Sequence, residues 1–232
     1  MDNNLNYETY IYLSSKKLII SVYTDLDKEI YQEKLEFKNK FEESNFEKLD
    51  YFLNINIFKI EKKIKTFVQN VSIILDLDIL FPVEISVKKN NYGDKINSKI
   101  LHHLLQEAKD SCKVTLNEKK IVHMLITDYL VDNKSYLILP RDINCSSFSL
   151  NLKFICISNI FVKDLEVILK KYQISLNKLF SASYLREYSS NQEEIFAIAK
   201  KIIKGHNPNE VTFVDKMRKN KGFFERFFSF FS

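Results

Sequence analysis

The sequence is poor in the small residue that builds phosphate-binding loops. Its 232 residues include only 3 glycines and 3 prolines, and tryptophan is absent. Glycine lets a backbone wrap closely around a phosphate, because a side chain would collide with the ligand or forbid the required φ angle. Gly93, Gly205 and Gly222 stand far apart. The sequence therefore argues against a phosphate loop and against a nucleotide-dependent enzyme.

Cysteine and histidine are also scarce, and their spacing suggests no metal site. The cysteines are Cys112, Cys145 and Cys156. They are odd in number and lack metal-ligand spacing, so we predict reduced, mostly buried thiols. His102 and His103 are adjacent and would point about 100° apart on a helix. His123 lies in an alternating run and is predicted as a half-buried, hydrogen-bonded histidine. We predict no catalytic residue, cofactor or metal.

Charge and hydropathy argue against two further classes of protein, those that bind nucleic acid and those that span a membrane. The net charge is +5, and residues 215–232 contribute +3 of it, so the rest of the chain is near neutral. We therefore expect no nucleic-acid partner. No run approaches the ~18 consecutive apolar residues of a membrane-spanning helix. The first residues are polar and do not resemble a signal peptide, so we expect a protein on the cytoplasmic side of the membrane.

Hydrophobic periodicity predicts an α/β fold with an α+β tendency. Alternation predicts strands at 7–14, 17–24, 29–37, 71–76, 82–88, 121–131, 136–139, 148–158 and 176–180. Apolar residues at i, i+3 and i+4 predict helices at 45–69, 97–112, 161–172 and 193–204. The region 71–158 reads strand, helix, strand, strand, which is typical of an inserted subdomain.

The last eleven residues carry the strongest functional pattern. They hold six of the 19 phenylalanines, which are Phe223, Phe224, Phe227, Phe228, Phe230 and Phe231. On a helix these rings fall within an arc of roughly 160°. The neighbouring cations are Lys216, Arg218, Lys219, Lys221 and Arg226. An aromatic face beside cations is typical of a helix lying in an anionic lipid interface. We predict a membrane-targeting helix at 222–232 and a tether at 206–221. The alternative is a helix that docks on protein.

The middle of the chain resembles the bacterial cell-division family FtsA. Residues 123–132, with His123, Tyr129 and Asp132, resemble the His-x5-Tyr-x2-Asp strand of the FtsA inserted subdomain. Residues 97–109 resemble the helix of that subdomain, which ends in a similar Glu-Ala-Lys. Residues 179–183 resemble the stretch that re-enters the actin-like domain. FtsA also ends in a tether and an amphipathic helix.

This resemblance implies a domain organisation and a role. It implies a partial actin-like (ribonuclease H-like) lobe at 7–70 and 159–205, with an inserted SHS2-type subdomain at 71–158. The expected protein is a peripheral membrane scaffold on the cytoplasmic side, at the division septum. It would self-associate or recruit division-machinery proteins.

The departures from FtsA favour a protein without catalysis. The first FtsA hairpin has an Asp and a Gly where this chain has Tyr12 and Ser14, and only its Lys is retained, as Lys17. The second phosphate loop and most of the second lobe have no counterpart, which makes direct FtsZ binding doubtful. Three alternatives stay open: an ATPase with divergent loops, a soluble interaction module, and an adaptor resembling the pilus-assembly protein PilM.

Overall fold

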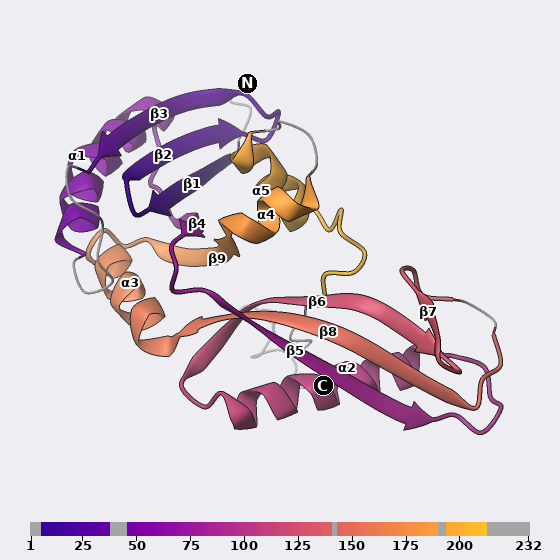
Figure 1. Cartoon of the computed structure of the whole chain (residues 1–232). Coiled ribbons are helices and arrows are strands. Elements are labelled where there is room, and N and C mark those ends of the chain that lie inside the picture. Colours follow the sequence, from indigo (N-terminus) through magenta and orange to yellow (C-terminus); the bar gives the residue numbers. More distant parts are fainter. Residues whose placement is uncertain (1–5, 38–45, 141–142, 190–193, 213–232) are drawn as a thin grey trace, which may run out of the picture.

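Two β-sheets organise the chain (Figure 1). The computed structural model describes residues 6–37, 46–140, 143–189 and 194–212. The first sheet has five strands in the order β3-β2-β1-β4-β9, and the second has four in the order β5-β8-β6-β7. Helices and strands are mixed along the chain without strict alternation. The predicted α/β fold class is confirmed.

The first sheet combines a meander with parallel strands. Its strands are β1 (Tyr7–Ser14), β2 (Lys17–Thr24), β3 (Glu29–Glu36), β4 (Asn70–Asp76) and β9 (Ser175–Ser181). β1, β2 and β3 are antiparallel to one another, whereas β4 pairs in parallel with both β1 and β9. Because parallel strands end at the same edge, Ser14, Asp76 and Ser181 meet there.

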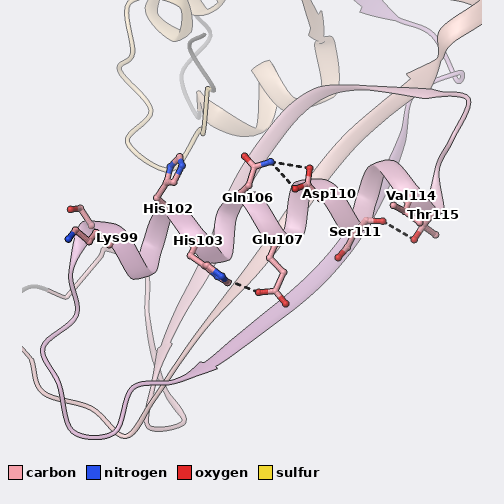
Figure 2. Close-up of a pocket in the computed structure, with 10 residues that line it drawn as sticks. Lys99, His102, His103, Gln106, Glu107, Asp110, Ser111, Val114 and Thr115 are labelled. Carbon is pink, nitrogen blue, oxygen red and sulfur yellow. Dashed lines mark hydrogen bonds and ion pairs between the residues drawn. The ribbon is translucent and has the colours of Figure 1, made fainter. Parts of the chain in front are cut away.

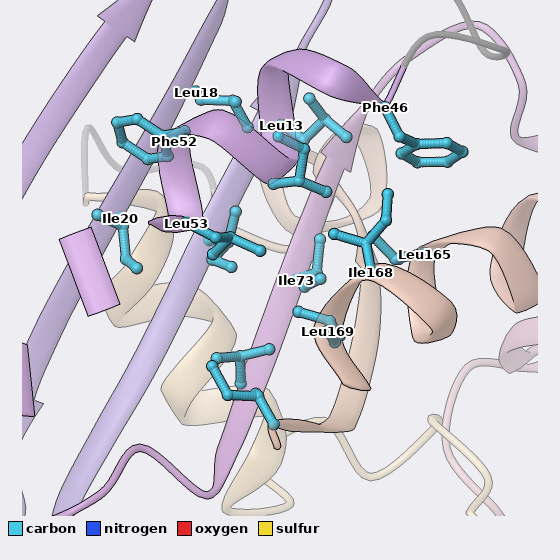
Figure 3. Packing of buried hydrophobic residues seen from close by; sticks show 14 of the residues in the cluster. Leu13, Leu18, Ile20, Phe46, Phe52, Leu53, Ile73, Leu165, Ile168 and Leu169 are labelled. Carbon is cyan, nitrogen blue, oxygen red and sulfur yellow. The ribbon is translucent and has the colours of Figure 1, made fainter. Parts of the chain in front are cut away.

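Helices cover both faces of the first sheet. One face packs against α1 (Glu47–Ile64) and α3 (Asn159–Lys171). Figure 3 shows Leu13 and Ile73 of the sheet facing Leu53 of α1 and Leu169 of α3. The other face packs against α4 (Ala182–Tyr188) and α5 (Ile195–Ile203). Strands buried on both faces explain the nearly continuous apolar run in β4.

The second sheet forms the inserted unit, which we define as residues 81–158. Its elements are β5 (Phe81–Asn90), α2 (Ser98–Thr115), β6 (Lys119–Val131), β7 (Lys134–Tyr136) and β8 (Ser147–Ser158). Apolar side chains of α2 and the strands form a separate core on one face. Asn97 caps α2, since its side chain accepts hydrogen bonds from the amides of Lys99 and Ile100.

The structure corrects three sequence predictions. Residues 71–76 form β4 of the first sheet, so the inserted unit begins at β5 and not at residue 71. The helix predicted to reach residue 69 ends at Ile64, because Lys65 adopts a left-handed conformation with φ 59°. α4 was missed because seven residues are too few to show a helical period. The prediction of buried, reduced cysteines is confirmed.

Candidate functional site

Tyr12, Asp76 and Arg186 form an interlocked group, the edge cluster, where the parallel strands of the first sheet end. Arg186 donates two hydrogen bonds to Asp76, from Nη1 to Oδ1 at 3.0 Å and from Nη2 to Oδ2 at 2.7 Å. The Tyr12 hydroxyl donates a short hydrogen bond to Oδ2 of Asp76, and Arg186 Nη2 donates to that hydroxyl at 3.2 Å. The edge cluster thus ties β1 and β4 to α4.

The edge cluster is balanced in charge at neutral pH. Hydrogen bonds from Arg186 hold the pKa of Asp76 below its usual value, and the bond to Asp76 raises the pKa of Arg186. Burial, followed by the hydrogen bond to Asp76, raises the pKa of Tyr12 to about 12. Asp76 is therefore anionic, Arg186 cationic and Tyr12 a neutral donor. Each charged group in the edge cluster already has its partner.

The hairpin beside the edge cluster contains Tyr12 and Ser14, the residues at which the sequence differs from the FtsA hairpin. Ser14 Oγ accepts hydrogen bonds from the amides of Lys16 and Lys17 at 3.3 and 3.0 Å. The Lys17 ammonium lies 5.5 Å from the centre of the Tyr12 ring. These residues line a cleft of about 690 Å³ that opens at the sheet edge. Ser14 therefore engages two backbone amides of the turn, those of Lys16 and Lys17.

A second polar group, the junction network, lies where the two sheets meet. Its central carboxylate is Glu210, whose side chain is only 7% exposed. Oε1 of Glu210 pairs with His123 Nδ1 at 3.0 Å and accepts from Lys178 Nζ at 3.2 Å. Oε2 accepts from the Tyr184 hydroxyl at 2.8 Å. These partners come from β6, β9 and α4, so a single carboxylate connects the inserted unit to the first sheet.

The hydrogen bonds of His123 determine its tautomer. Its Nε2 lies 3.0 Å from the amide nitrogen of Ser181, and an amide can only donate. Nε2 is therefore unprotonated, and Nδ1 carries the proton that is donated to Glu210. Burial lowers the pKa of His123, which favours this neutral form. Burial alone would raise the pKa of Glu210, but the hydrogen bond from His123 and the charge of Lys178 bring it below its usual value.

The segment that contains Glu210 is bound to the body of the protein. We call residues 206–212 the junction segment. The amide of Ile126 donates to the Asn209 carbonyl at 2.9 Å, and the amide of Val211 donates to the Met124 carbonyl at 2.8 Å. The junction segment thus extends the second sheet along β6. The prediction of a tether at 206–221 is therefore wrong for residues 206–212, because their backbone and Glu210 are both bonded to the fold.

Two of the three FtsA-like motif residues contact the junction segment. His123 binds Glu210, and the Tyr129 hydroxyl donates to Asn209 Oδ1 at 3.3 Å. Asp132 instead shapes the turn after β6, with φ 45°, and accepts hydrogen bonds from the amides of Ser146 and Ser147. Sequence reasoning missed Glu210 and Arg186. Both are charged residues in polar surroundings, and nothing nearby in the sequence marks them as paired.

The predicted membrane-binding residues belong to the C-terminal tail, residues 213–232, which lies outside the described residues. They are Lys216, Arg218, Lys219, Lys221, Phe223, Phe224, Arg226, Phe227, Phe228, Phe230 and Phe231. Across the described parts of the chain, no helix has both the length and the apolar character that crossing a bilayer requires.

The outer face of α2 has a depression of about 1240 Å³, and the described residues that line it all belong to that helix. Figure 2 shows that the polar side chains bond along the helix, with Gln106 bound to Asp110 and His103 facing Glu107 at 3.7 Å. His102 and His103 point to different sides. Within the described ranges, no three His, Cys, Asp or Glu side chains are grouped so that they could hold a metal ion.

Comparisons with known proteins give remote similarities of structure only. No family model matches the sequence, and no curated protein does. One similar structure is the cytoplasmic domain of EpsL, an inner membrane component of the type II secretion system of Vibrio cholerae. It is 8% identical over 78% of this chain and 59% of that one, with a TM-score of 0.41. A second is the PilM–PilN type IV pilus biogenesis complex, 9% identical over 78% of this chain and 49% of that one, with a TM-score of 0.46.

A third similar structure is a Bacteroides thetaiotaomicron protein with an actin-like ATPase fold and unknown function. It is 15% identical over 78% of this chain and 55% of that one, with a TM-score of 0.32. The chain spans only about half the length of these three structures. The similarity to these three structures is one of fold alone.

Proposed function

We propose that this chain is a non-catalytic, FtsA-like scaffold that attaches peripherally to the cytoplasmic face of the cell membrane through residues 216–232. In this role it associates with copies of itself and recruits proteins of an envelope machinery. The observation that carries the proposal is the docking of the junction segment by Glu210, because the C-terminal tail follows directly after that segment.

The docked junction segment would give the scaffold a defined orientation. A membrane anchor on a long, freely rotating linker only confines a protein near the lipid. Here Asn209 and Val211 are bonded to β6, and Glu210 is bonded to both sheets. The point at which the tail leaves the body is therefore fixed. A preorganised exit lowers the entropic cost of presenting the same surface to partners.

The edge cluster supports the absence of catalysis. A phosphate is bound by backbone amides and cations that face it and have no other partner. In the β1–β2 hairpin Ser14 engages the amides of Lys16 and Lys17, and beside the hairpin Arg186 of α4 is held in a two-bond contact with Asp76. Binding a nucleotide there would require both contacts to break.

The free energies expected for membrane binding by the tail indicate a reversible attachment. Complete burial of a Phe side chain contributes about 1.5–3 kcal/mol, and an interfacial helix buries each ring only in part. Each Lys or Arg near an anionic surface adds about 1 kcal/mol. Ordering the helix costs several kcal/mol in return. The resulting affinity of a single copy is modest, so self-association would strengthen membrane residence.

Liposome flotation tests the proposal. We expect the full chain to float with vesicles that contain anionic lipid. Changing Phe224, Phe227 and Phe228 to Glu should weaken binding by at least about tenfold, since the apolar face is lost. The matched control is Phe58→Glu with Phe67→Glu, which changes two exposed rings of the body and should float like the parent. Equal flotation of the tail variant and the parent would refute membrane attachment through the tail.

Two machineries are candidates for recruitment, and the location of a fluorescent fusion in cells would distinguish them. The FtsA resemblance implies the division apparatus, so the fusion should gather at midcell in dividing cells. A PilM-like adaptor would instead gather at sites of pilus or secretion assembly and ignore the division cycle.

A further inference from the structure

We propose that β5 is the self-association surface of the inserted unit, and that two copies of the chain join their β5 strands into one continuous antiparallel sheet. β5 is ten residues long and lies at the edge of the second sheet, paired on one side with β8 (Figure 1). Among the described residues, no strand pairs with its other side. This inference gives a surface to the self-association in the proposed function, but it does not require membrane attachment.

The hydrogen bonds around β8 show which backbone groups of β5 point outward. Asn90 lies opposite Ser147, so the same register places Asn91 opposite Ser146. The amide of Asn91 donates to the Ser146 carbonyl at 2.7 Å, and Asn91 therefore directs its backbone groups toward β8. Asp132 of the other neighbouring segment donates to the Ser147 carbonyl at 3.1 Å. Neighbouring residues of a strand direct their amides and carbonyls to opposite sides. The odd-numbered residues of β5 therefore bond to β8, and the even-numbered residues present their groups to the open edge.

The position of Pro82 in β5 is consistent with even-numbered residues directing their backbone groups to the open edge. Pro82 has no amide hydrogen and would leave a gap in the β8 ladder if its nitrogen pointed inward. As an even-numbered residue it directs that nitrogen to the open side, where edge strands tolerate proline. Exposed side chains follow the same alternation, since Glu84, Ser86 and Lys88 are exposed while Val87 is buried against α2.

The sequence of β5 is self-complementary about Ser86. In a two-fold antiparallel pair centred there, Ser86 faces Ser86 of the second copy, and Glu84 faces Lys88 twice. Ile85 faces Val87 on the side that carries α2. Opposite charges directly across a strand pair are favourable, and the outward backbone groups of Glu84, Ser86 and Lys88 meet in hydrogen-bonded pairs. A shift of the centre by one residue would place Lys88 opposite either Pro82 or Ser86, and both charge pairs would be lost.

Edge strands that stay unpaired are usually protected, and β5 is protected only at its ends. Proline and lysine are the common blocking residues, and here they occupy positions 82, 88 and 89. The central stretch 83–87 contains neither. In the two-fold pair Lys88 is neutralised by Glu84, so the charge that would repel an unrelated strand favours a second copy.

Site-directed crosslinking of the full chain tests the register. Under mild oxidation Ser86→Cys should form a disulfide-linked dimer, because the two Cα atoms would lie about 5.5 Å apart. Glu84→Cys alone and Lys88→Cys alone should not, but a mixture of these two variants should crosslink to each other. The native cysteines are buried and common to all variants. Equal crosslinking of Ser86→Cys and Glu84→Cys alone would overturn the proposal.

Charge reversal tests the same surface without oxidation. Glu84→Lys should raise the dimer dissociation constant in sedimentation by about tenfold or more, since two favourable pairs become repulsive. The double variant Glu84→Lys with Lys88→Glu should restore dimerisation, and unchanged circular dichroism would show that both fold. Failure of the swap to restore the dimer would overturn the proposal.

A chain that stays monomeric but floats with liposomes refutes the β5 pair alone, whereas a dimer that does not float refutes membrane attachment alone.

Discussion

Glu210 accepts a hydrogen bond from Nδ1 of His123 at a distance of 3.0 Å, and this contact fastens the junction segment to the inserted unit. The same carboxylate also binds Lys178 and Tyr184. Glu210 also lies only three residues before the start of the C-terminal tail at residue 213. The stability of the fold and the proposed exit point of the tail therefore depend on the same residue.

Replacing Glu210 with Ala should lower the free energy of unfolding by about 2–4 kcal/mol, because it leaves His123 and Lys178 without their partner. Urea unfolding of the variant and the parent measures this difference. The control is Glu187→Ala, which removes an exposed ion pair with Lys153 and should cost less than about 1 kcal/mol. Similar losses for the two variants would contradict the central place of Glu210.

Acidification should destabilise the fold in two stages. Burial lowers the pKa of His123 in the folded state, so the unfolded chain takes up this proton first, and stability falls as pH drops below about 6.5. The pKa of Glu210 is also lowered, so its contribution is present above its unfolded pKa and is lost as pH falls through the folded value. In His123→Gln the loss that begins near pH 6.5 should vanish while the loss at lower pH remains. Unfolding curves across pH would show both stages.

Mg-ATP should not bind this chain measurably, because Ser14 engages the Lys16 and Lys17 amides of the hairpin and Asp76 holds Arg186 beside it. Isothermal titration checks this directly. Arg186→Ala should lower the free energy of unfolding by only about 1 kcal/mol, since the Arg186 side chain is half exposed, and it should not create binding. Heat of binding from the parent chain at micromolar nucleotide would contradict the assignment.

The three cysteines should resist thiol reagents while the chain is folded. Burial raises the pKa of Cys112 and raises that of Cys156 to about 12, so little thiolate is present at neutral pH. Cys145 is also buried. Counting labelled thiols by mass spectrometry should give none in buffer and all three in denaturant. Rapid labelling of Cys112 in the folded chain would show that α2 detaches from its sheet.

Much of the fold could be predicted from the sequence because local patterns carry it. The alternation in residues 7–24 and the cap at Asn97 fix their elements without help from distant residues. The assignment of β4 failed because a short buried strand shows no sign of which sheet it joins. That choice depends on its parallel pairing with β1, which is a long-range contact.

The candidate site was predictable only where the sequence could be compared with a known pattern, as for His123 and Tyr129, which match the FtsA strand. Tyr12, Ser14 and Lys17 were recognised because they replace or retain residues of the FtsA hairpin. Arg186 and Glu210 could not be recognised, since their partners lie 110 and 87 residues away at Asp76 and His123. A charged residue that looks solvent-exposed in the sequence becomes a central contact only when the chain folds.

Intrinsic fluorescence would report directly whether the phenylalanines of the C-terminal tail meet lipid. The chain has no tryptophan, so Phe227→Trp reports on the tail alone. Its emission should shift to the blue when anionic vesicles are added, while Phe58→Trp on the exposed side of α1 should not respond. An emission from Phe227→Trp that is already blue-shifted in buffer and unchanged by vesicles would mean that the rings pack into protein, and would contradict the account.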